Sequence, residues 1–290
     1  IMSVSLKDLK KNYSNLNVEF DLWKGESDAQ PYIPAMIDDL VEKGLAYESQ
    51  GALVVDIAEE TDTKELPPCI IRKSDGAALY ATSDLATIVE REQDFHPDRY
   101  IYVVDKRQEL HFIQVFRVAK KAGIVKEDTP MIFLGFGTMN GKDGGPFKTR
   151  EGGVMRLEHL IKNIDEKVYE KIQEKQKVPA DEMTRTAEIV GLAALKYADL
   201  SNQATKDYIF DVDRFISFEG NTGPHIQYMI VRIKSILEKY KELRGADAKV
   251  VPIRPAESET EKALQMALCR FGEVTESAFY ETAPHKLCQY

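Results

Sequence analysis

The chain has 290 residues, of which 43% are hydrophobic and 30% charged, and its formal net charge is −9 at pH 7; this length predicts two compact units, or one and a half. With no apolar run near the ~20 residues of a membrane span and no signal-peptide core, we expect a cytoplasmic globular protein with no membrane partner and at most a local basic face. Cys69, Cys269 and Cys288 are odd in number and far apart, which argues against disulfides and structural zinc and predicts buried thiols.

The first predicted elements are a short helix and a group of β-rich runs. Pro31 and Pro34 precede an apolar series, and Gly44 stands where this helix would end. The run 52–57 is strand-like, and 68–82 contains the pair Asp75-Gly76 between two β-rich halves. Such a pair predicts a hairpin turn.

Strand and helix signals alternate in the next part of the chain. Residues 82–95 and 106–123 have helical periodicity, whereas 99–105 and 130–136 are continuous apolar runs typical of buried strands. Continuous apolar strands joined by helices are typical of a parallel, doubly wound sheet that is covered on both faces. We therefore predict an α/β unit here.

Beyond about residue 157 the strand signals fade and only helices are predicted. Asp181 is expected to cap one of them, and Pro224 to be the first helical residue of another. Ser258 and Glu261 have the spacing of a capping box. The segment from Pro224 has an apolar stripe and an excess of basic residues, typical of a bundle helix with a charged outer face. The stripe consists of Ile226, Ile230, Ile233, Leu237 and Tyr240.

Ligands of parallel sheets collect at the carboxyl ends of the strands. Polar residues follow three β-rich runs: Tyr80 with Asp84, Asp105 with Gln108 and His111, and the Gly-rich loop 135–153. Each has an ordinary alternative, because an acid favours a helix start and a helix histidine commonly bonds a neighbour. Three such clusters in succession favour a binding site.

The loop 135–153 holds seven glycines, three basic residues and one proline. Exposed backbone N–H groups with lysine or arginine suit phosphate. The spacing does not match a P-loop. Five residues separate Gly135 from Gly141 where four are needed, and Asp143 follows Lys142 where Ser or Thr is needed. The dinucleotide fingerprint does not match either, because it would need glycine at Asn140. A long hairpin with a solvated basic tip stays an alternative.

Together these segments resemble the arginyl-tRNA synthetases, a family of class I aminoacyl-tRNA synthetases, over nearly the whole chain. The resemblance is carried by "FDLWKGES", "DGAALYATSDLA", "RYIYVVDKRQELHFIQVF", "GFGTMNGKDGGPFKTREGG", "KDYIFDVDRFISFEGNTGPHIQY" and "APHKLCQY". It implies ATP-dependent activation of L-arginine to arginyl-adenylate and transfer to tRNA(Arg), with ATP bound as its Mg²⁺ complex and no structural metal. The implied fold is the C-terminal half of a Rossmann-type catalytic domain over 1–160 with a small β-hairpin insertion near 51–80. A helical connection over 161–215 and part of an α-helical anticodon-binding domain over 216–290 would follow.

The resemblance also implies an ATP side of the site. "FKTREGG" looks like the family's form of the KMSKS loop, in which Lys148, Thr149 and Arg150 would clamp the triphosphate. Such a loop can close on ATP and stabilise charge on departing pyrophosphate. Gly137, Thr138 and Met139 match the part of the family's loop that lies against the adenine ring of ATP.

The arginine side is implied by Tyr80, Asp84 and Gln108. A carboxylate is the natural partner of the planar guanidinium fork, and an aromatic face makes a good wall. Asp84 would take the fork, Gln108 would add an acceptor, and Tyr80 would shape the pocket. His111 and Gln114 match the family's "HxxQ" pattern and are expected near ATP.

One family signature has no match, since none of the five histidines begins an H-x-G-H-type segment. We therefore expect a piece of a synthetase, cut at both ends, that forms no adenylate alone and self-associates, whereas the complete enzyme would be monomeric. A non-catalytic synthetase-like paralogue that binds tRNA or a protein stays an alternative, as does an unrelated nucleotide-binding α/β protein. An upstream HIGH-type motif in the same frame would decide.

Overall fold

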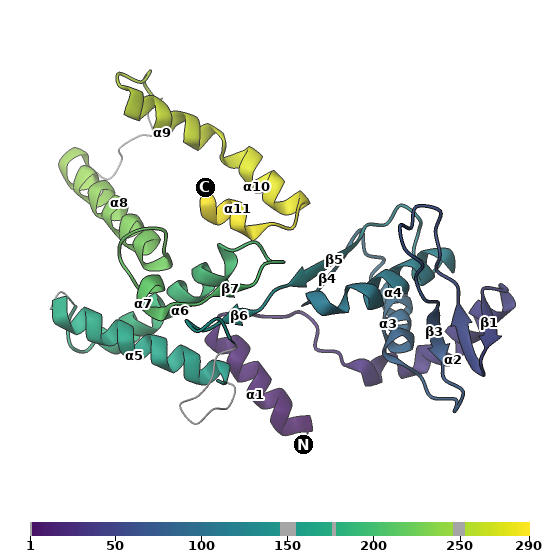
Figure 1. The fold of residues 1–290 in the computed structure, drawn as a ribbon. Helices are drawn as coiled ribbons and strands as arrows, with labels where there is room; N and C mark the ends of the chain where they lie inside the picture. The colour runs from purple at the N-terminus through teal and green to yellow at the C-terminus, as the bar shows by residue number, and fades with distance from the viewer. Residues whose placement is uncertain (1, 146–154, 176–177, 246–252) are drawn as a thin grey trace. The chain divides into compact units, whose positions relative to one another are not determined.

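A computed structural model describes residues 2–145, 155–175, 178–245 and 253–290. The chain forms two compact units, one from Phe20–Phe136 and one that joins Ile1–Glu19 to Gly137–Tyr290. Each unit has its own cluster of buried hydrophobic side chains. Figure 1 shows the helices and strands of the two units.

The Phe20–Phe136 unit contains both β and α elements. In chain order these are η1 (Glu26–Tyr32), α2 (Ile33–Glu42), β1 (Ala46–Ser49), β2 (Ala52–Val55), β3 (Cys69–Arg72), α3 (Tyr80–Asp94), β4 (Tyr100–Asp105), η2 (Lys106–Gln108), α4 (Glu109–Lys121) and β5 (Met131–Phe136). Strands β1, β2 and β3 form an antiparallel sheet, and β4 pairs with β5 in parallel.

The turn predicted at Asp75-Gly76 is confirmed, but the second predicted strand of that hairpin is wrong. Gly76 has a φ of 84°, and the Asp75 carboxylate accepts a hydrogen bond from the Ala77 N–H at 2.9 Å. After one bridge at Ala78 the chain enters α3. The buried Thr82 hydroxyl favours this change, because it accepts from the Leu79 N–H and donates to the Ile71 carbonyl.

The parallel β4–α4–β5 unit is confirmed, with Tyr100 opposite Met131 and Asp105 opposite Phe136. Tyr102 of β4 contacts the rings of Phe112 and Phe116, so α4 packs against this face of the strand. The opposite face of β4 is exposed within the residues that the structure describes. Its alternate side chains point the other way, and Ile101 and Val103 are 43% and 60% exposed.

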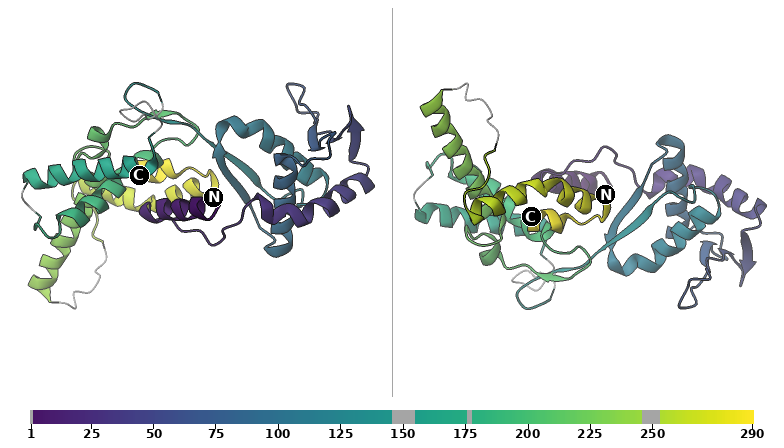
Figure 2. Two further views of the ribbon diagram at one scale, coloured as in Figure 1. Left: turned by 90° about the horizontal axis from the view of Figure 1, so that it is seen from below. Right: turned by 90° about the horizontal axis from the view of Figure 1, so that it is seen from above.

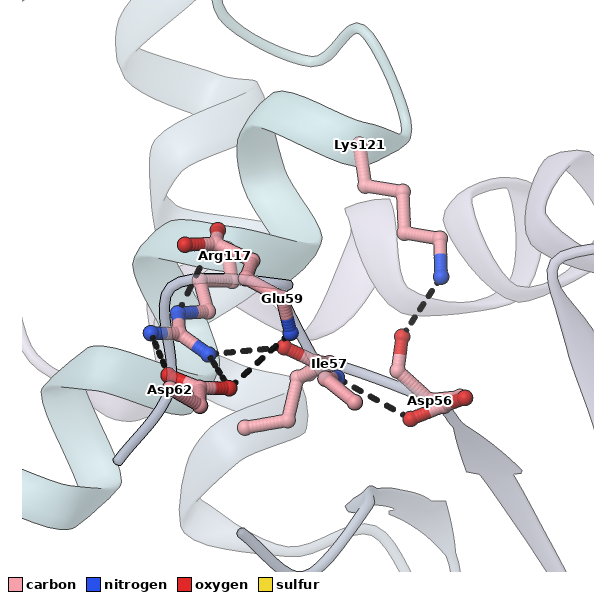
Figure 3. Close-up of polar contacts among 7 residues, drawn as sticks. Asp56, Ile57, Glu59, Asp62, Arg117 and Lys121 are labelled. Carbon is pink, nitrogen blue, oxygen red and sulfur yellow. Dashed lines mark hydrogen bonds and ion pairs between the residues drawn. The ribbon is translucent and has the colours of Figure 1, made fainter. Parts of the chain in front are cut away.

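Polar side chains of α4 hold the segment 56–68 that joins β2 to β3 (Figure 3). The Arg117 guanidinium donates to both carboxylate oxygens of Asp62 at 2.6 and 2.7 Å, and to the Ile57 carbonyl at 2.9 Å. One turn on, Lys121 donates to the Asp56 carbonyl at 2.7 Å. Because Arg117 is close, the pKa of Asp62 falls from 3.8 to about 2. Arginine is suited to this planar, two-bond contact.

The second unit is mostly helical in the part that the structure describes. Its elements are α1 (Met2–Asn15), β6 (Met139–Asn140), α5 (Leu157–Lys175), α6 (Met183–Leu200), β7 (Tyr208–Ile209), α7 (Val212–Phe215), α8 (Gly223–Arg244), α9 (Glu259–Cys269), α10 (Phe271–Tyr280) and α11 (Pro284–Gln289). Helices α5 and α6 lie side by side (Figures 1 and 2), and their apolar faces form most of the buried core.

One carboxylate enters the contact between α5 and α6. A Cβ atom on Gly191 of α6 would lie 2.2 Å from the Asp165 Oδ1 of α5, so a larger residue at this position would displace the Asp165 carboxylate. Burial raises the pKa of Asp165 to about 6, and the nearby charge of Glu188 adds to the effect. The ionised form of Asp165 is therefore disfavoured in the folded unit.

The predicted helix starts have mixed outcomes. The prediction for Asp181 is wrong, because α6 begins one residue later and Glu182 occupies its N-cap position. Pro224 is in the first turn of α8 as predicted, although Gly223 is the first residue and the Thr222 hydroxyl supplies the cap. Ser258 caps α9 by accepting from the Glu261 N–H at 3.2 Å. The reverse half of the capping box is shifted, since the Glu261 carboxylate accepts from the Glu257 N–H.

The apolar stripe of α8 is exposed along its whole length, whereas the first two residues of the helix are buried.

The three cysteines differ in burial. Cys69 is buried, and burial raises its pKa to about 12. Cys288 is half-buried and Cys269 is exposed, so the prediction of buried thiols is wrong for Cys269. Over the described ranges, no helix is both long and apolar enough to cross a membrane.

The contact between Arg117 and Asp62 predicts that the stability of the Phe20–Phe136 unit falls at acidic pH. A lowered carboxylate pKa adds stability that is present above 3.8 and lost as the pH falls toward about 2. We expect Arg117→Met to lower the thermal midpoint at pH 7 and to flatten its fall between these two pH values. Lys121→Met is the matched control, because it removes only a bond to a carbonyl. Equal acid slopes in wild type and Arg117→Met would contradict the prediction.

The buried Asp165 predicts the opposite pH dependence. A raised carboxylate pKa adds stability that is present below 3.8 and lost as the pH rises toward about 6. We expect Asp165→Asn to stabilise this unit at pH 7 by about 1–2 kcal/mol, after allowance for partial solvation. Denaturant titrations at pH 3.5 and pH 7, compared with Glu166→Gln on the same helix, measure this. A gain of equal size at both pH values would contradict it.

Candidate functional site

Tyr80 and Asp84 lie one turn apart on α3 and so occupy the same side of that helix. Tyr80 is the first helical residue and is 72% exposed, whereas Asp84 is half-buried. An exposed ring one turn before a partly buried carboxylate provides both a wall and an acceptor. These two features suit a planar cationic ligand.

The structure brings His111 to Asp84, although 27 positions separate them in the sequence. The His111 Nε2 atom lies 2.6 Å from the Asp84 Oδ2 atom, so α3 and α4 are joined by this hydrogen bond. The His111 ring meets Phe112 edge to face, with centroids 4.8 Å apart. Two residues expected on opposite sides of the site, one for arginine and one for ATP, are therefore direct partners.

Two further residues near Asp84 were not found from the sequence. Arg91 of α3 donates a hydrogen bond to the Tyr102 hydroxyl of β4 at 3.0 Å. Burial raises the pKa of Tyr102 to about 12; the charge of Arg91 opposes this shift and that of Asp84 adds to it. Arg91 is seven residues after Asp84, a spacing that places both on one helix side and could have indicated the cluster.

Gln108 ends η2 directly before α4 and is exposed. It follows the carboxyl end of β4, where ligands of parallel sheets are expected. Asp105, at the strand end itself, is bound by Arg107 through two side-chain contacts of 2.9 and 2.6 Å, which lower its pKa to about 2. Gln108 is thus displayed at the strand end while Asp105 shapes the turn.

Gln114 lies one turn after His111 on α4, but its side chain has a structural contact. Its amide donates to the carbonyls of Pro67 and Pro68 at 3.0 and 3.2 Å. These bonds hold the chain that leads into β3. Gln114 therefore adds a third attachment between α4 and the segment 56–68.

The residues predicted to lie against adenine belong to the second unit. Gly137 N–H donates to the Ala204 carbonyl, and a Cβ atom at Gly137 would lie 2.4 Å from the Lys206 carbonyl oxygen, which explains the glycine. Thr138 N–H donates to the Asp207 carboxylate at 2.7 Å. Met139 begins β6, which pairs in parallel with β7 and packs on the helical core. This backbone is therefore firmly placed.

The part of the Gly-rich loop that the structure describes is fixed by ion pairs. Lys142 contacts the carboxylates of Asp211 and Asp213 at 3.0 and 3.2 Å, and Lys167 contacts Asp213 at 2.7 Å. Lys148, Thr149 and Arg150 lie outside the described residues. Within the described ranges, no three histidine, cysteine or acidic side chains gather as a metal site.

Comparison with known proteins gives two family matches. Residues 1–212 match the catalytic domain of the class I (R) tRNA synthetases, and residues 226–290 match the DALR anticodon binding domain. The chain is 60% identical over 298 aligned residues to a protein named arginine–tRNA ligase of Agathobacter rectalis, covering all of this chain and 50% of that protein. The chain is also 56% identical over 292 aligned residues to the arginine–tRNA ligase of Alkaliphilus oremlandii. That match covers all of this chain and 49% of the relative.

Solved structures show the same fold. The arginyl-tRNA synthetase of Plasmodium falciparum matches with a TM-score of 0.82 at 23% identity, over 100% of this chain and 48% of that one. The arginyl-tRNA synthetase of Thermus thermophilus matches with a TM-score of 0.77 at 21% sequence identity. The match covers 97% of this chain and 52% of that one. The predicted fold class is confirmed, and the chain spans about half the length of the curated relatives it matches. It belongs to the class I (R) tRNA synthetase family, with a catalytic-domain region followed by a DALR anticodon-binding region.

Proposed function

We propose that the protein carrying this chain is an arginine–tRNA ligase, which activates L-arginine with ATP and transfers it to tRNA(Arg). The observation that carries the proposal is the Asp84 carboxylate, held on α3 with the exposed Tyr80 ring one turn away. A guanidinium is a flat cation with a fork of donors, and this pair offers it an anion and an aromatic face. The relatives named above support the same activity.

Arginine recognition then divides among three residues of the Phe20–Phe136 unit. Asp84 accepts from the guanidinium fork, Tyr80 forms a wall of the pocket, and Gln108 adds an acceptor from the end of β4. Asp84 is the dominant contact, because a charge-assisted two-bond pair is stronger than a neutral hydrogen bond. An uncharged analogue of similar shape leaves that carboxylate unpaired and is rejected.

The ATP side draws on residues of the second unit. Gly137, Thr138 and Met139 offer closely placed backbone to the adenine ring. ATP enters as its Mg²⁺ complex, and Lys148, Thr149 and Arg150 act on its phosphates, with the cations favouring the charge that develops on pyrophosphate. Gln114, matched by the family's HxxQ pattern, supports α4 of the Phe20–Phe136 unit through the segment 56–68.

The helical region supplies contacts to tRNA(Arg). Basic side chains outnumber acidic ones on α8, and residues 226–290 match an anticodon-binding family. A local basic face is sufficient to attract phosphates although the whole chain is acidic. We assign the catalytic part to 1–160, a helical connection to 161–215 and the anticodon-binding part to 216–290, in a cytoplasmic enzyme that is monomeric at full length.

An exchange assay tests the activity directly. A protein of full family length that carries this chain should exchange pyrophosphate into ATP when arginine is present, and should charge tRNA(Arg) but not other tRNAs. Lysine and citrulline are the matched amino acids, since each lacks the charged fork. Exchange that proceeds equally with lysine, or none with arginine, would reject the proposed function.

Asp84→Asn separates arginine recognition from ATP recognition. A neutral amide offers the guanidinium one acceptor and no charge, and loss of a charge-assisted pair in a closed site costs on the order of 2 to 5 kcal/mol. We expect kcat/KM for arginine to fall at least about 30-fold while KM for ATP changes little. Asp94→Asn, near the other end of α3, is the control. Equal losses for both substrates would remove Asp84 from the arginine pocket.

A further inference from the structure

We propose that His111 is a positioning residue of the arginine pocket, which holds the Asp84 carboxylate in the orientation that receives the guanidinium fork. This inference rests on the proposed function and deepens it. It moves His111 from the ATP side, where its sequence pattern placed it, to the arginine side.

The contact itself has the features of a strong hydrogen bond. The atoms His111 Nε2 and Asp84 Oδ2 lie 2.6 Å apart, and the two side chains are only 24% and 32% exposed. Limited exposure reduces competition from water, and a carboxylate acceptor shortens and strengthens the bond. An aspartate near the start of a helix has several open rotamers, so a fixed donor on a second helix selects one of them.

Capacity remains on Asp84 after this bond is made. An ionised carboxylate has about four acceptor positions on its two oxygens, and His111 uses one of those on Oδ2. The Oδ1 atom and the second position on Oδ2 can still accept two parallel N–H bonds. A bidentate fork needs the carboxylate plane to coincide with the guanidinium plane, and rotation about the Asp84 side chain would lose one of the bonds.

His111 is itself held by the scaffold of its unit. Its ring packs against Phe112, which stacks with Phe133 of β5. Further along α4, Gln114 and Arg117 attach the helix to the segment 56–68. The orientation of the carboxylate therefore derives from packed helices and strands and needs no contact with ATP. This predicts that loss of the His111 donor is felt in arginine binding alone.

Two substitutions separate the donor from the bulk of the ring. His111→Leu keeps an apolar side chain but removes the donor, whereas His111→Gln places an amide N–H at nearly the reach of Nε2. In a protein of full family length, we expect His111→Leu to raise KM for arginine about 10-fold or more, with kcat and KM for ATP within about twofold of wild type. We expect His111→Gln to restore most of the arginine affinity. In an Asp84→Asn background, His111→Leu should add less than about twofold, because the pair acts as a unit.

The controls distinguish this inference from the activity on which it rests. Glu109→Gln, on the same helix, should leave both KM values unchanged, and thermal unfolding of each variant shows whether α4 is intact. An unchanged arginine KM in His111→Leu, a rise in the ATP KM instead, or equal defects in the Leu and Gln variants would each overturn the positioning role while arginine-dependent exchange by the wild type persists. Absence of that exchange in the wild type would overturn the proposed function and this role with it.

Discussion

The attachment of α4 to its surroundings is the constraint on which the Phe20–Phe136 unit depends. Apolar residues such as Val115 and Val118 bury one side of the helix, and polar residues on another side bind the segment 56–68 and α3. Helix packing alone permits small rotations and shifts. Several directed hydrogen bonds at successive positions along α4 remove that freedom, so α3 and the segment 56–68 are fixed relative to the same helix.

This arrangement explains which parts of the fold were predictable. The alternation β4–α4–β5 was predicted because continuous apolar runs and a helical period are local signals, and a parallel pair requires a crossover. The turn at Asp75-Gly76 was predicted for the same reason, because glycine supplies the positive φ there. The next residues were predicted as strand and form helix, since the hydroxyl of Thr82 binds a carbonyl eleven residues away, which no local pattern encodes.

The candidate site shows the same division. Tyr80, Asp84 and Gln108 could be selected from the sequence because they follow strand-like runs, and the resemblance supplied their roles. The partnership of Asp84 with His111 could not, because it depends on how α3 and α4 pack, and the "HxxQ" pattern points to ATP. Likewise Gln114 has the side-chain type of a ligand contact, but its amide binds the two proline carbonyls before β3. Residue type and spacing select candidates, and tertiary packing assigns their partners.

Asp84 shows how the packing of two helices orients a partly buried carboxylate. A partly buried carboxylate loses water contacts, and hydrogen-bond donors from the protein replace them. Around Asp84 the structure supplies the His111 Nε2 atom at 2.6 Å, and the Tyr102 hydroxyl, which accepts from Arg91, is close enough for the Asp84 charge to act on it. Under the proposed function, a guanidinium meets an acceptor that is already oriented, so little reorganisation is needed when the fork closes on it. On that proposal, selectivity for a flat cation follows from the orientation of this carboxylate, because a guest without a donor fork cannot form two parallel hydrogen bonds with it.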